Sequence, residues 1–185
     1  SDWEGAEFTA QKDITGEGDG EITKFSATMG GNFESGNAVL SLEYTKREEI
    51  FQGDRDYSLC PASESGGVPF CAGSGTTYPA HIFPDSGGST IYKDGVYRNF
   101  DAAQDSFNYA TQSYQVTPQE TFSVNGSAFK HLIEDGFTTL RAFGEGGFSN
   151  RVSDQLMAPI GTFWAPLVGA DHPDNPAGED VYVAR

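Results

Sequence analysis

The chain has 185 residues, enough for one domain and at most a small second one, and carries 27 acidic against 11 basic side chains, for a formal charge of −16. That charge repels phosphate backbones, so we expect no nucleic-acid partner. With 23 Gly, 14 Phe and 8 Tyr but only 37% hydrophobic residues, the composition is unusual for a closely packed globule. No stretch approaches the ~18 consecutive apolar residues that a membrane-spanning helix requires.

The first quarter of the chain alternates between apolar and polar side chains, which predicts β-strands. Residues 3–11 form the first predicted strand, and the Gly-rich residues 12–20 form a loop. Residues 21–33 and 38–51 alternate in the same way and are separated by a short Glu-Ser-Gly-Asn turn. We therefore expect these two runs to pair as an antiparallel hairpin with one apolar and one polar face.

The alternation disappears in residues 52–119, which contain Pro, repeated Gly pairs and both cysteines. Loops of this length are uncommon in compact domains and are usually functional or disordered. Disordered segments contain few aromatic residues, whereas this stretch contains ten. We therefore expect an ordered long loop that packs on its own side chains.

The two cysteines, Cys60 and Cys71, lie within this loop. Their spacing does not match the paired C-x-x-C knuckles of zinc sites. A small disulfide in an oxidising compartment is the interpretation that we favour, and two free thiols are the alternative.

Period-2 alternation returns in residues 120–132 and 138–150, which are joined by a short turn. Residues 151–185 are again irregular and Pro-rich, and we interpret them as the start of a second long loop. No segment predicts a helix. The expected fold class is therefore all-β, with five antiparallel up-and-down strands.

The connections and the apolar face favour a membrane barrel. Short turns alternate with much longer connections, as in bacterial outer-membrane barrels. The apolar face contains many Gly and Ala, with aromatic residues toward the strand ends, although a soluble sandwich needs larger side chains to fill its core. The strand lengths also fit the ~9 to 11 residues that cross a bilayer at a tilt. We expect part of a transmembrane β-barrel whose long loops are extracellular.

Several motifs resemble the first barrel strands of TonB-dependent outer-membrane receptors from proteobacteria. The motifs are Gly30-Gly-Asn-Phe33, Gly36-Asn-Ala-Val-Leu-Ser-Leu-Glu-Tyr44, Ile50-Phe-Gln-Gly-Asp-Arg-Asp56, Thr117-Pro-Gln-Glu120, Phe148-Ser-Asn-Arg151 and Ser153-Asp-Gln-Leu-Met-Ala-Pro159. The resemblance covers most of the strand-forming chain and does not extend to the middles of the long loops.

The resemblance implies an outer-membrane transport protein without enzymatic activity or cofactor. Receptors of this family take up a scarce nutrient, such as a siderophore or an oligosaccharide, when the TonB complex rearranges a plug domain. The chain departs from the family because it has no TonB box, no plug and five strands instead of twenty-two. Five strands cannot close a barrel in lipid. We therefore expect a fragment, or one piece of a barrel that the remaining barrel and plug polypeptide completes.

Candidate binding residues come from aromatic side chains in the long loops, which are suited to stacking on a sugar ring or a siderophore. These residues are Tyr78, Phe83, Tyr92, Tyr97 and Trp164. Packing of each ring within its own loop is the alternative interpretation.

Other candidate chemistry is weak. The three histidines have no metal-ligand spacing, and no nucleophile and base form a recognisable set. The acidic residues Asp171, Asp174, Glu179 and Asp180 contain the oxygen ligands of a calcium site, but without EF-hand spacing a solvated acidic loop is the preferred interpretation.

A second hypothesis from another class is a soluble secreted all-β binding module, of the carbohydrate-binding or adhesin type, with its site on the loops. The two hypotheses differ in detergent dependence. A barrel segment is recovered from outer membranes, whereas a binding module dissolves in plain buffer.

Overall fold

The computed structural model describes residues 3–156 and 159–185. Met157 and Ala158, which belong to one of the receptor-like motifs, lie outside the described residues. The chain divides into two compact units, unit 1 (residues 1–50 and 116–155) and unit 2 (residues 51–115 and 156–185). The all-β class is confirmed, because the described residues form antiparallel strands and a single α-helix of four residues. No described helix has the length and apolar character needed to cross a membrane.

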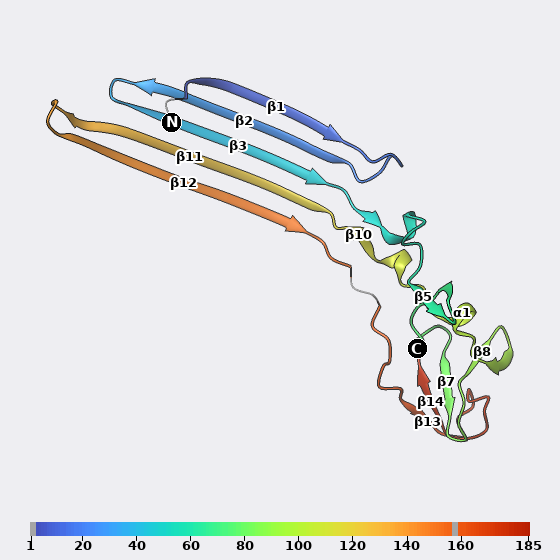
Figure 1. Cartoon of the computed structure of the whole chain (residues 1–185). Helices are drawn as coiled ribbons and strands as arrows, with labels where there is room; N and C mark the ends of the chain where they lie inside the picture. Colours follow the sequence, from blue (N-terminus) through green and yellow to red (C-terminus); the bar gives the residue numbers. More distant parts are fainter. Residues whose placement is uncertain (1–2, 157–158) are drawn as a thin grey trace. The chain divides into compact units, whose positions relative to one another are not determined.

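Unit 1 is one antiparallel sheet in the order β1-β2-β3-β11-β12 (Figure 1). Its strands are β1 (Gly5–Asp13), β2 (Ile22–Phe33), β3 (Gly36–Arg47), β11 (Gln119–Glu134) and β12 (Thr139–Ser153). These correspond to the five predicted strands with shifted ends. β3 ends at Arg47, short of the predicted residue 51, and β12 continues to Ser153, past the predicted residue 150.

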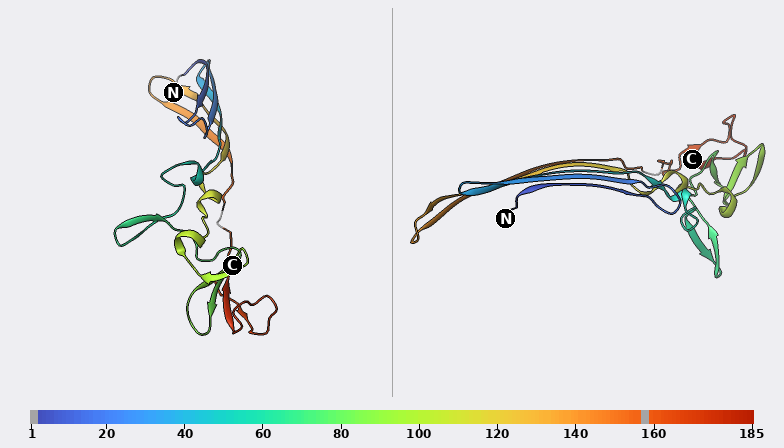
Figure 2. Two further views of the ribbon diagram at one scale, coloured as in Figure 1. Left: turned by 90° about the vertical axis from the view of Figure 1, so that its right-hand side faces the viewer. Right: turned by 90° about the horizontal axis from the view of Figure 1, so that it is seen from above.

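The register of the sheet keeps its two faces uniform. Phe25 pairs with Tyr44, and Tyr44 pairs with Phe122, so apolar positions align across three strands. The same pairing aligns Ser26 with Glu43 on the opposite face. Because side chains alternate along each strand, in-register pairing extends one apolar and one polar face over the whole sheet. Seen edge-on in Figure 2, the sheet is a single curved layer, and no other described element of unit 1 covers either face.

Unit 2 contains a second sheet, in the order β13-β14-β7-β8-β9, and a separate hairpin, β5-β6. The sheet strands are β7 (His81–Pro84), β8 (Thr90–Lys93), β9 (Val96–Asn99), β13 (Leu167–Val168) and β14 (Val181–Ala184). The hairpin strands are β5 (Ala62–Ser65) and β6 (Val68–Cys71). The short helices are η1 (Gln52–Asp54), α1 (Ala102–Asp105) and η2 (Ala110–Gln112). Two further short strands, β4 (Ile50–Phe51) and β10 (Tyr114–Val116), pair with each other.

Unit 2 differs from the sequence-based expectation of two separate loops. Residues 52–119 and 151–185 both contribute strands to one sheet, because β14 pairs with β7. The buried apolar side chains of the unit lie mainly on these strands, namely Ile82, Ile91, Val181 and Ala184. The expected packing of residues 52–119 on themselves is thus replaced by a small core that residues 159–185 help to build.

Candidate functional site

The apolar face of unit 1 is ordered in rows that run across the strands. One row joins Phe25, Tyr44 and Phe122, which are direct cross-strand partners. The next row toward the short turns includes the residues Phe8 and Phe148, which are 73% and 61% exposed. Large aromatic rings exposed to this extent in neighbouring rows form a continuous apolar patch, which marks an interaction surface.

Charged side chains lie toward both ends of this apolar face, as a row of several at one end and as the single residue Lys130 in its row at the other. At the end where β3 leads into β4, Lys46 pairs with Glu120. At the short-turn end, Lys130 pairs with Gly36. About ten residues of β3 separate the two rows, or about 34 Å at ~3.4 Å per residue and about 26 Å in height at a strand tilt of ~40°. This height matches the ~25 Å apolar band of outer-membrane barrels.

The opposite face of unit 1 carries hydroxyl, amide and charged side chains. The hydroxyl oxygens of Thr28 and Ser41 lie 3.0 Å apart, and those of Ser123 and Ser149 lie 3.1 Å apart. A hollow of about 400 Å³ lies on this face, lined in part by Ser41, Asn125, Ser127 and Glu145. Cross-strand hydroxyl pairs and an acidic hollow suit a face in contact with water.

Of the predicted ligand aromatics, Tyr92 and Tyr97 are brought together. They are direct cross-strand partners in the β8–β9 hairpin, and both rings are partly exposed. The Tyr97 hydroxyl is hydrogen-bonded to the Thr90 hydroxyl at 2.8 Å. This bond limits the movement of one ring and leaves the pair as a small aromatic platform.

The other three predicted aromatics do not join this platform. Phe83 shares the sheet face of His81, and its ring centroid lies 4.2 Å from that of the imidazole. Register and alternation place Phe83 on the face opposite to Tyr92. Tyr78 and Trp164 are 72% and 71% exposed, and the Arg185 guanidinium lies 5.3 Å from the Tyr78 ring. The structure therefore does not gather the five aromatics into one binding site.

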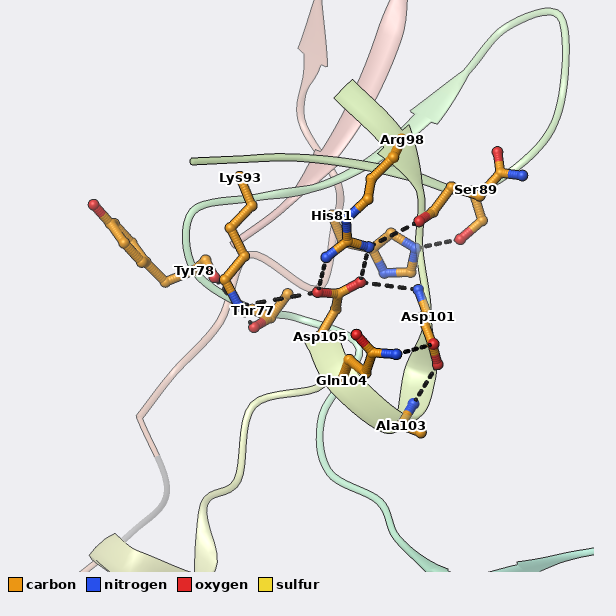
Figure 3. Close-up of polar contacts among 11 residues, drawn as sticks. Thr77, Tyr78, His81, Ser89, Lys93, Arg98, Asp101, Ala103, Gln104 and Asp105 are labelled. Atoms are coloured by element: carbon orange, nitrogen blue, oxygen red, sulfur yellow. Dashed lines mark hydrogen bonds and ion pairs between the residues drawn. The ribbon is translucent and has the colours of Figure 1, made fainter. Parts of the chain in front are cut away.

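A polar cluster around α1 lies inside unit 2 (Figure 3). The Asp105 side chain has no exposed area, and the two Arg98 guanidinium nitrogens donate to its oxygens at 2.5 and 2.6 Å. Lys93 lies 3.9 Å from the same carboxylate, and the Asp101 backbone N–H donates to it at 2.9 Å. The Arg98 hydrogen bonds hold the pKa of Asp105 down to about 2, against burial, which raises it.

His81 forms a second part of this interior. Its Nδ1–H donates to the Gly75 carbonyl at 2.8 Å, and its Nε2 accepts from the Ser89 hydroxyl at 2.5 Å. The ring stacks on Phe100 with centroids 3.7 Å apart, and burial lowers the pKa of His81 below 6.5.

The hydrogen bond between Ser89 and His81 is as short as that between a nucleophile and its general base. The sequence does not indicate this contact, because no catalytic motif surrounds either residue. Aromatic rings cover the imidazole, and both of its nitrogens are satisfied by the fold. We therefore assign the pair to the core of unit 2 rather than to catalysis.

The two cysteines and two of the acidic residues considered for a calcium site form local contacts in the fold. Cys60 and Cys71 form a disulfide at the open end of the β5–β6 hairpin. The Glu179 carboxylate accepts from the Ser86 backbone N–H at 2.8 Å and from its hydroxyl at 2.6 Å. Asp180 accepts from the Ala170 N–H at 2.8 Å. Across the described parts of the chain, no group of three or more His, Cys, Asp or Glu side chains is arranged to hold a metal ion.

Comparisons of the chain with protein-family models, with curated proteins and with solved structures found no match.

Proposed function

We propose that unit 1 is a segment of the wall of a bacterial outer-membrane β-barrel, and that the chain belongs to a TonB-dependent receptor that takes up a nutrient. The observation that carries the proposal is the uncovered apolar face of a five-stranded sheet. Exposed apolar area costs about 25 cal/mol per Å² in water, and acyl chains remove that cost without close shape complementarity.

The connections support an orientation. The β2–β3 and β11–β12 turns are short and lie at one end of the sheet, because Gly36 pairs with Lys130 next to both turns. Short turns face the periplasm in outer-membrane barrels, and long connections face outward. In this orientation residues 48–118 form an extracellular segment. This segment contains the Tyr92–Tyr97 platform, on which a nutrient such as a sugar or a siderophore could stack.

The sheet edges support the need for further strands. The outer edges of β1 and β12 have no partner strand among the described residues. Unpaired backbone N–H and C=O groups are costly in lipid, so a barrel wall requires partners at both edges. In this proposal the remaining barrel and plug polypeptide supplies these strands and the contact with the TonB complex.

Detergent dependence tests the proposal. The chain, purified in a neutral detergent, is diluted into plain buffer or into phospholipid vesicles and followed by light scattering and by flotation. We expect it to aggregate in buffer and to float with the vesicles, because the apolar face needs acyl chains. A chain that stays monomeric in buffer and does not float contradicts the proposal and supports the soluble binding module instead.

A further inference from the structure

Four residues form an unusual group on the polar face of unit 1, near its short-turn end. Phe129 and His131 lie on β11, and Phe143 and Arg141 lie opposite them on β12. The register pairs His131 with Arg141 and Phe129 with Phe143. We call this group the Arg141 patch.

Two polar groups of the Arg141 patch, the Arg141 guanidinium and the Nδ1 atom of His131, have no polar partner among the described residues. The Arg141 guanidinium lies 3.9 Å above the centre of the Phe129 ring, and no carboxylate of the described residues forms an ion pair with it. The Nδ1 atom of His131 is buried without a hydrogen-bond partner. Buried polar atoms are normally satisfied, so the orphaned nitrogen beside an unpaired cation indicates that part of this site is supplied from elsewhere.

The apolar part of the Arg141 patch is equally out of place. Phe143 is 75% exposed on a face that otherwise carries mostly polar side chains. Beside it lies a hollow of about 200 Å³, lined in part by Asn37, Phe129 and Arg141. Arginine and aromatic residues beside a small hollow are typical of the energetic centre of a protein–protein interface.

We propose that the Arg141 patch docks an acidic polypeptide segment. A carboxylate of that segment accepts hydrogen bonds from the free edge of the Arg141 guanidinium, which the Phe129 ring already holds in place. An apolar neighbour of the carboxylate covers Phe143. The inference rests on the proposed function only in that the polar face of the sheet points away from lipid.

The chemistry favours a polypeptide over other anions. An inorganic anion pairs with Arg141 but leaves Phe143 exposed to water. A nucleic acid offers both charge and stacking, but its backbone is a row of phosphates that needs several cations, and the Arg141 patch contains one arginine. An acidic segment with apolar neighbours satisfies both halves of the patch, because its carboxylate pairs with Arg141 and its apolar side chain covers Phe143.

A peptide titration tests the docking site. The full chain in neutral detergent is titrated with a short labelled peptide in which Glu alternates with Leu, and with the same peptide carrying Gln in place of Glu. We expect Arg141→Gln to weaken binding of the Glu peptide by roughly tenfold or more, the size of a lost charge-assisted hydrogen bond, and to leave the Gln peptide unaffected. Arg141→Lys keeps the positive charge but loses the paired N–H donors of the guanidinium. It is therefore expected to bind the Glu peptide less tightly than the unaltered chain and more tightly than Arg141→Gln.

Arg151→Gln is the matched control, because Arg151 lies on the same face of the same strand and pairs with Thr121 at the other end. Equal weakening by both substitutions, or equal affinity for the Glu and Gln peptides, overturns the docking site. Phe143→Ala is expected to weaken the binding of both the Glu peptide and the Gln peptide. Vesicle flotation of the unaltered chain separates the two proposals. A chain that floats but does not bind the Glu peptide rejects only the Arg141 patch, whereas a chain that does not float contradicts the proposed function.

Discussion

At the scale of single residues, the interior of unit 2 depends on two titratable side chains held in opposite ways. Asp105 keeps its charge through two short hydrogen bonds from Arg98, and Asp101 caps the start of α1 by accepting from the Ala103 N–H at 3.0 Å. His81 is held neutral by burial between rings. Four-residue strands and one helical turn bury little apolar area, so these polar contacts carry a large share of the local order.

Acid is expected to destabilise unit 2 in two steps. The unfolded chain protonates His81 near pH 6.5, whereas the folded chain does so only at lower pH, so stability is complete above pH 6.5 and declines as the pH falls below it. Asp105 adds a second loss between its ordinary pKa of 3.8 and its folded value of about 2.

Urea titrations followed by NMR of the β7–β9 amides, at about pH 7.5 and about pH 5.5, measure the first step through the shift of the urea midpoint. His81→Gln removes the titrating group, and the midpoint of this variant is expected to change less between the two pH values. An unchanged pH dependence in His81→Gln assigns the first step to another group.

At the scale of elements, the sheet of unit 1 depends on close approach of β3 to β11, two strands that are separated by residues 48–118. Gly36 lies where a Cβ atom would collide with the Phe129 carbonyl oxygen. Gly144 lies on β12 with open space where its Cβ would be. Both glycines lie on the apolar face, but only at Gly36 does the structure leave no room for a Cβ atom.

Gly36→Ala is expected to lower the free energy of unfolding of the sheet by about 1–3 kcal/mol. The added methyl group would collide with the Phe129 carbonyl oxygen, which is part of the backbone and cannot move aside as a flexible side chain can. Gly144→Ala serves as the control and is expected to be near neutral. Urea unfolding in detergent measures both. A Gly36→Ala variant as stable as Gly144→Ala shows that β3 and β11 approach less closely than the structure indicates.

At the scale of the whole molecule, the two faces of unit 1 differ in the charge that they tolerate, so two residues adjacent in the sequence can respond differently to the same substitution. Leu42 lies on the apolar face between Ala27 and Val124, whereas Ser41 lies on the polar face beside Thr28. If acyl chains cover the apolar face, an added charge is costly at one residue and harmless at the next.

Leu42→Arg is expected to weaken association of the chain with vesicles by up to about 2–4 kcal/mol, the cost of a cation on the lipid face of a barrel. Ser41→Arg is expected to associate normally. Flotation with vesicles compares the two variants. Equal flotation of both variants indicates that acyl chains do not cover the apolar face.

Much of unit 1 was predictable from local sequence. Alternation located all five strands, and the short turns indicated both hairpins, with errors of a few residues at the ends. The end of β3 was misplaced because two apolar residues, Ile50 and Phe51, follow it closely, and they form the separate short strand β4. The loop aromatics were not predictable as a group, because Phe83 and Tyr92 lie on opposite faces of a sheet whose existence had no local signal.

The sequence by itself determined the all-β class and the two-faced character of unit 1, because side-chain alternation is a property of neighbouring residues. Only the tertiary structure decided how residues 51–115 and 159–185 share one sheet, how Ser89 reaches His81 and how Arg141 comes to lie over Phe129. The four-residue strands of unit 2 are too short for periodicity to identify. Their partners are distant in the chain, so their pairing depends on burial and hydrogen bonds that no local pattern records.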